Sequence, residues 1–102
     1  MVMMNLTKEE ILSTLEANEA TIKGFGVCSL SLFGSFVRGE NTANSDLDFV
    51  VEFEKKTFDA YMDLKLYLEA LFGRPVDLVL ADAIKPRLRA PILEDAVHAP
   101  GL

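Results

Sequence analysis

The chain has little of what a secreted, membrane-bound or nucleic-acid-binding protein needs. Cys28 is its one cysteine, so no disulfide can form within the chain. No apolar run approaches the roughly 20 residues that cross a membrane, and the first residues lack the basic start and apolar core of a secretory leader. Acidic residues outnumber basic ones by 16 to 10, which opposes binding to nucleic acid phosphates. We therefore expect a cytoplasmic protein with no membrane and no nucleic acid among its direct partners.

The length leaves room for one domain. We treat residues 1–102 as a single unit, because a chain of this size supports one small core. Half of the residues are hydrophobic and a quarter are charged, which is the balance of a globular protein. The net charge of −6 suits a basic protein partner.

Hydrophobic spacing predicts a series of alternating helices and strands, without repeats or a linker. The expected elements are a helix from Thr7 to about Gly24, a strand over Val27–Phe33, a short helix near Phe36, a strand over Asp46–Phe53, a helix over Thr57–Phe72, a strand over Pro75–Leu80 and a final helical region.

Local signals indicate where the helices begin and end. Thr7 is placed to cap the first helix while Glu10, three residues on, reaches back to it. Asp82 can cap the final helical region, and Pro86 fits its first turn. Pro91 should break or restart that helix, because proline lacks the amide donor that a helix interior uses.

This order of elements predicts an α/β (α+β) domain with a small mixed sheet of three to four strands covered by helices. The first two strands can share a site only if they run antiparallel, and the long helix before the third suits a parallel crossover. In the first strand, alternation puts Cys28, Leu30 and Leu32 on one face. Cys28 is then expected to be a buried structural thiol.

Three aspartates come together at one edge of such a sheet. Asp46 and Asp48 are two residues apart, so both carboxylates project from the same face of their strand. Asp77 opens the neighbouring strand. Mg²⁺ prefers carboxylate oxygens combined with substrate phosphates, and two ions about 4 Å apart could hold the attacking and leaving oxygens of a displacement. The sequence therefore predicts a magnesium site at this edge.

Gly34 and Ser35 follow the first strand and point to the same edge. Glycine allows the backbone to approach a phosphate closely, and Ser35 lies where it could cap a helix whose amides face the ligand. Each feature also has a simpler interpretation. An Asp-x-Asp pair is often a solvated turn, a Gly-Ser pair often ends a strand, and Arg38 could be a surface ion-pair partner. The combination favours a site.

The motif Gly34–Glu40, followed by Ser45–Val51, closely resembles the DNA polymerase beta-type nucleotidyltransferase superfamily, in particular its minimal nucleotidyltransferase (MNT) branch. Ten residues separate the Gly-Ser pair from the Asp-x-Asp pair. The third carboxylate of the family falls on Asp77, within Pro75–Val79. The resemblance spans roughly residues 27–97, which is most of the chain.

That resemblance implies ATP as nucleotide donor, two Mg²⁺ ions, and transfer of AMP with release of pyrophosphate. Gly34 and Ser35 would contact the triphosphate, and the three aspartates would be the catalytic, metal-holding groups. Arg38 matches a family position, with contact to a phosphate or to an internal carboxylate left open. Val37 departs from the small residue usual there, and the additional substrate-binding domain of larger relatives has no counterpart in these residues.

Members of the MNT branch are commonly encoded beside a HEPN-type ribonuclease toxin and act as its antitoxin, so the implied reaction is adenylylation of a tyrosine on that toxin. Two alternatives stay open. One is a non-catalytic antitoxin that neutralises its partner by binding alone, and the other is a small-molecule (antibiotic-type) nucleotidyltransferase. A neighbouring gene for a helical protein with an Arg-(x)4–6-His motif would favour the toxin partner.

Overall fold

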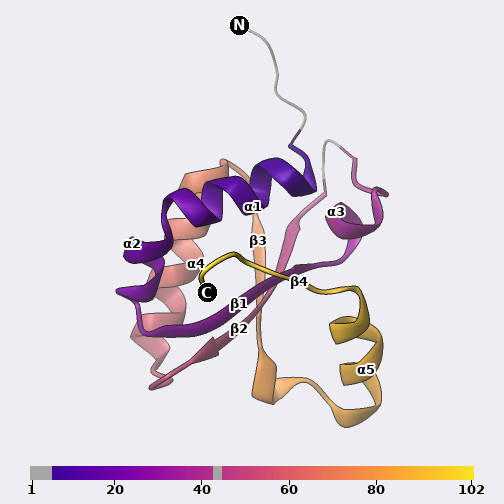
Figure 1. Cartoon of the computed structure of the whole chain (residues 1–102). Coiled ribbons are helices and arrows are strands. Elements are labelled where there is room, and N and C mark those ends of the chain that lie inside the picture. Colours follow the sequence, from indigo (N-terminus) through magenta and orange to yellow (C-terminus); the bar gives the residue numbers. More distant parts are fainter. Residues whose placement is uncertain (1–5, 43–44) are drawn as a thin grey trace, which may run out of the picture.

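A computed structural model describes residues 6–42 and 45–102 of the chain (Figure 1). Its elements are α1 (Lys8–Ala17), α2 (Glu19–Lys23), β1 (Val27–Phe33), α3 (Ser35–Arg38), β2 (Leu47–Phe53), α4 (Phe58–Phe72), β3 (Val76–Leu80), the 3₁₀ turn η1 (Ala81–Ala83), α5 (Pro86–Asp95) and β4 (Val97–His98). Within those ranges, none of the helices has the length and apolar character that crossing a bilayer requires.

The strands form one mixed sheet in the order β3-β2-β1-β4. β1 runs antiparallel to both β2 and β4, and β2 runs parallel to β3, with α4 as the crossover between them. The predicted fold class and both predicted strand pairings are therefore confirmed. β4 is a fourth strand that the hydrophobic spacing did not locate, and the count of four lies within the predicted three to four.

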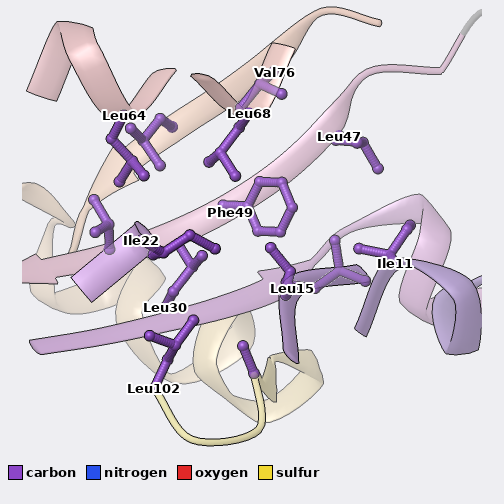
Figure 2. Packing of buried hydrophobic residues seen from close by; sticks show 14 of the residues in the cluster. Ile11, Leu15, Ile22, Leu30, Leu47, Phe49, Leu64, Leu68, Val76 and Leu102 are labelled. Carbon is purple, nitrogen blue, oxygen red and sulfur yellow. The ribbon is translucent and has the colours of Figure 1, made fainter. Parts of the chain in front are cut away.

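The core lies on one face of this sheet. The residues of β2 alternate between the two faces, as predicted for this strand, and its inward residues Leu47, Phe49 and Val51 are fully buried. Phe53 is partly buried, and Val50 on the opposite face is buried as well. Figure 2 shows Phe49 of β2 lying between Leu68 of α4 and Leu15 of α1. The long helix and the N-terminal helices thus cover the same face, which leaves the opposite face, with Asp48, available for a site.

The N-terminal helix begins as predicted but ends early. Thr7 Oγ1 accepts a hydrogen bond from the amide of Glu10 at 3.1 Å, and the Glu10 carboxylate accepts one from the Thr7 amide at 3.1 Å. Asn18 then interrupts the helix with φ −112° and ψ 18°, while its side chain donates to the carbonyl of Thr14 at 2.8 Å. Asparagine can compete with the helical backbone in this way, so the segment divides into α1 and α2.

The prediction for Cys28 was wrong, because its side chain is exposed. The pairing of β1 with β2 shifts between Val27 and Ser29, which is a β-bulge. A bulge adds one residue to the alternation, so Val27 and Leu30, three residues apart, are both buried and Cys28 turns outward.

Two predictions for the C-terminal region were also wrong. Asp82 caps no helix, and its carboxylate instead pairs with Lys56 at 2.9 Å. α5 starts at Pro86 as predicted but continues through Pro91 to Asp95. The proline removes one amide donor and crowds the carbonyl of Arg87, yet both residues are exposed, so water can hydrate that carbonyl and the helix tolerates the change.

Candidate active site

The three predicted motifs meet at one end of the sheet. Phe33, the last residue of β1, is directly opposite Asp48 on β2, and Asp48 is directly opposite Asp77 on β3. Gly34 and α3 follow Phe33 at once, so they lie beside the start of β2, at the upper right of Figure 1. Strand pairing thus places the Gly-Ser turn and the Asp-x-Asp pair next to each other.

The carboxylates of this edge share one electrostatic environment. Burial raises the pKa of Asp48, and the charges of Asp77 and then Asp46 raise it further, while Arg38 acts in the opposite direction. Asp48 is half-buried, whereas Asp46 and Asp77 are exposed. A negative charge at Asp48 is therefore disfavoured by its neighbours, and a cation would relieve that repulsion.

The donor chemistry of the edge fits Mg²⁺. Within residues 6–42 and 45–102, no group of three or more His, Cys, Asp or Glu side chains is already arranged to hold a metal ion. Magnesium is usually bound by one or two carboxylates together with substrate phosphates and water, which neighbouring Asp48 and Asp77 can satisfy. The metal-holding roles of Asp46, Asp48 and Asp77 stay predictions.

Gly34 brings the backbone against Asp48. It is buried, with φ +84° and ψ −152°, a conformation that is essentially restricted to glycine. A Cβ atom at this position would overlap the Asp48 carboxylate. The backbone of Gly34 therefore closely approaches the Asp48 carboxylate, whereas its predicted approach to a phosphate stays a prediction.

Ser35 is the first residue of α3 and does not cap it. The cap position belongs to Gly34, whose backbone is not helical, and no side chain bonds to the helix start. The predicted capping role was wrong because Ser35 has already entered the helix. Its side chain borders the cleft.

Gly34, Ser35 and Asp48 line a cleft of roughly 430 Å³. Asp46 and Asp77 are not among its lining residues. Its walls come from the end of β1, from α3, from β2 and from the C-terminal half of α5. The lining residues are Phe33, Gly34, Ser35, Arg38, Asp48, Pro91, Ile92 and Asp95. The wall combines charged and polar side chains with the apolar side chains of Phe33, Pro91 and Ile92, a combination typical of small-molecule and cofactor sites.

Arg38 lies in the cleft wall but contacts internal carboxylates. Its Nε donates to Glu40 at 2.8 Å and its Nη1 to Asp95 at 3.4 Å, and the hydrogen bond to Glu40 is the main reason that its pKa is raised. Of the two contacts left open for this residue, the structure shows the one with carboxylates. Its predicted phosphate contact stays a prediction.

Sequence reasoning missed the contribution of α5. Asp95 is 57 residues from Arg38 in the chain, and Pro91 and Ile92 carry no motif. The sequence predicts only a final helical region here and gives no signal of a site.

The edge of β3 beside Asp77 is held by α4. Glu69 accepts hydrogen bonds from Lys65 at 2.9 Å and from the backbone amide of Val76 at 3.1 Å, which together lower its pKa. The hydrogen bond to Glu69 is the main cause that raises the pKa of Lys65, with a smaller contribution from the charge of Asp77. These contacts anchor the strand that carries the third aspartate.

A second, larger cavity of roughly 610 Å³ lies between the start of α4 and the end of β3. Its lining is mostly apolar, and its polar side chains make structural contacts. Thr57 caps α4, Tyr61 donates to the carbonyl of Leu78 at 2.6 Å, and Lys56 pairs with Asp82. The chemistry therefore belongs to the smaller cleft.

Comparison with known families agrees with this geometry. The family model "Nucleotidyltransferase domain" matches residues 11–98. The protein adenylyltransferase MntA of Thermococcus cleftensis is 40% identical over 98 residues, which cover 94% of this chain and 99% of that protein.

Two solved structures extend the comparison. One, assigned as a minimal nucleotidyltransferase, is 36% identical with a TM-score of 0.79 and covers 91% of this chain and 96% of its own. The other is a tri-AMPylated HEPN toxin in complex with an MNT antitoxin from Shewanella oneidensis. It is 20% identical with a TM-score of 0.57, and the match covers 85% of this chain and 72% of that chain. At this identity the likeness supports the fold alone.

Proposed function

Since this chain belongs to the nucleotidyltransferase domain family, we propose that it transfers AMP from ATP to a tyrosine hydroxyl of a HEPN-type ribonuclease toxin, with Mg²⁺, and so acts as the antitoxin of that toxin. The observation that carries the proposal is the strand register that places Asp48 beside both Asp77 and the Gly34 turn. Nucleotidyl transfer needs these two features together, because carboxylates bind the metal and the turn receives the phosphates.

The carboxylates and the Gly34–Ser35 turn have separate roles in the proposed reaction. Asp46, Asp48 and Asp77 would hold Mg²⁺, which neutralises phosphate charge and favours loss of the acceptor proton. Ser35 donates its hydroxyl to a phosphate oxygen, beside the backbone of Gly34. Arg38 supplies positive charge at the same wall, once it leaves Glu40 or Asp95.

The reaction is a displacement at the α-phosphorus of ATP. The tyrosine oxygen forms a bond to that phosphorus, the bond between it and the bridging oxygen to the β-phosphate breaks, and pyrophosphate leaves. Asp77, exposed at the start of β3, takes the tyrosine proton. Apolar Pro91 and Ile92 of α5 shield the other side of the cleft.

The net charge of the chain and the comparison with related proteins support a protein acceptor. The net charge of −6 favours a basic partner surface and opposes RNA. A relative of near-equal length is named as a protein adenylyltransferase, and the Shewanella complex pairs an MNT antitoxin with an AMPylated HEPN toxin. A co-encoded helical toxin is therefore the acceptor we propose.

The test is mass spectrometry of the co-encoded partner after incubation with ATP and Mg²⁺. We expect adducts of AMP mass on a tyrosine, and their loss when EDTA removes the metal. The double variant Asp46→Asn, Asp48→Asn should reduce transfer by at least about 100-fold, because neutral amides bind the hard cation poorly.

The matched control is Asp59→Asn with Asp63→Asn, two exposed aspartates of α4 whose loss changes the net charge equally. This control should transfer AMP at the rate of the unmodified chain. A different result would identify a binding-only antitoxin. In that case the unmodified chain and the Asp46→Asn, Asp48→Asn variant would neutralise the partner equally well, and no adduct would form.

A further inference from the structure

Arg74 contacts two segments of the active site at once. Its Nη1 donates to the backbone carbonyl of Ser45 at 3.1 Å. Its guanidinium carbon lies 5.2 Å from the centre of the Phe36 ring, within the range of a cation–π contact. The next residue, Pro75, accepts a hydrogen bond from the amide of Leu47 at 3.0 Å.

The contacted residues adjoin the predicted catalytic groups. Ser45 comes directly before Asp46, and Phe36 directly after Ser35. Arg74 itself is three residues before Asp77 on the segment that leads into β3. One side chain therefore connects the approach to β2, the phosphate turn with its helix α3, and the start of β3.

Local structure aims this side chain at the site. Gly73 ends α4 with φ +66° in the left-handed region, and its amide donates to the backbone carbonyl of Glu69 at 2.8 Å. The chain turns back there, so Arg74 is half-buried instead of extending into solvent. Only a planar guanidinium can stack on a ring and donate in its own plane, so lysine cannot reproduce both contacts.

We propose that Arg74 is a positioning residue that holds the Asp46–Asp48 segment, α3 and the start of β3 in their catalytic arrangement. The effect on turnover rests on the proposed function, whereas the arrangement itself does not. Arg74 does not line the cleft, so it acts through the groups that it holds and not on the nucleotide. Its loss should therefore slow turnover more than it weakens ATP binding.

The experiment compares Arg74→Ala with Arg89→Ala. Arg89 is a matched control, because it also donates to a backbone carbonyl, that of Ala81 at 3.2 Å, but is exposed and outside the cleft. We expect kcat for AMP transfer by Arg74→Ala to fall by about 10- to 100-fold, since small misplacements of reacting groups have effects of this size. KM for ATP should stay nearly unchanged, and Arg89→Ala should match the unmodified chain.

Two further readouts separate positioning from general stability. Amide hydrogen exchange should accelerate locally in residues 35–38 and 45–48 of Arg74→Ala, and millimolar guanidinium should restore part of its kcat where equal sodium chloride does not. Should Arg74→Ala fail to fold, Arg74→Lys takes its place, with the same direction expected. An unchanged kcat, or exchange that accelerates equally along the whole chain, would overturn the proposal.

The proposed function can fail separately. If the unmodified chain transfers no AMP, the local hydrogen exchange still decides whether Arg74 holds the three segments together. Local acceleration then supports the positioning role, and its absence overturns it.

Discussion

Replacing Gly34 by alanine tests the packing of the phosphate turn against Asp48. Two costs add at this position. The backbone conformation, φ +84° and ψ −152°, costs a residue with a side chain about 1–3 kcal/mol. The overlap of the new Cβ with the Asp48 carboxylate costs about 1–3 kcal/mol more, as for other overpacked sites.

The combined loss is therefore about 2–6 kcal/mol of unfolding free energy, from a domain whose total is roughly 5–15 kcal/mol. At about 4–8 °C per kcal/mol, the melting temperature should fall by roughly 10 °C or more. Urea unfolding followed by circular dichroism measures the free energy, and thermal unfolding followed by the same signal measures the melting temperature. Gly39→Ala is the control, because Gly39 also has a left-handed φ, +72°, but a Cβ atom added there would meet no other atom. This variant should therefore lose only about 1–2 kcal/mol of unfolding free energy.

A double-mutant cycle isolates the contact. In an Asp48→Ala background the overlap is gone, so Gly34→Ala should cost only the backbone share of about 1–3 kcal/mol. If Gly34→Ala loses no more than Gly39→Ala, or if its cost is the same in both backgrounds, the turn does not pack on Asp48 and the reasoning is refuted.

Two further predictions concern the edge of β3. The folded protein lowers the pKa of Glu69, so its carboxylate stabilises the fold above the ordinary glutamate pKa, and this stabilisation disappears as the pH falls through the lowered value. Glu69→Gln should thus reduce the unfolding free energy at pH 7, and the reduction should become progressively smaller below pH 4.5. The control Glu16→Gln, on α1, should not reduce the unfolding free energy. Tyr61→Phe should lose about 1 kcal/mol in urea unfolding, because it leaves the Leu78 carbonyl without its donor. Unfolding curves that coincide with the unmodified chain would contradict either prediction.

The sheet could be predicted because its signals are local. Strict alternation over the second strand identified the buried face on which Phe49 lies, and the long amphipathic segment after it required a parallel crossover. A site shared by the Gly-Ser and Asp-x-Asp pairs then required antiparallel neighbours, and the first two strands do pair in this way.

The errors arise where pairing partners decide the outcome. The exposure of Cys28 follows from a bulge against β2, which the residues of β1 alone do not encode. Pro91 stays helical because solvent surrounds the turn before it. The α5 wall and the bridge from Arg74 both join residues that are distant in the chain and share no motif, so only the tertiary structure brings them together.

The contacts along β3 also restrict how a partner can approach. An edge strand normally invites another chain to add a strand, through its unpaired amides and carbonyls. Here the Val76 amide and the Leu78 carbonyl are already taken by Glu69 and Tyr61, so an incoming strand would lose two hydrogen bonds or displace two side chains of α4. Self-association through this edge is correspondingly discouraged.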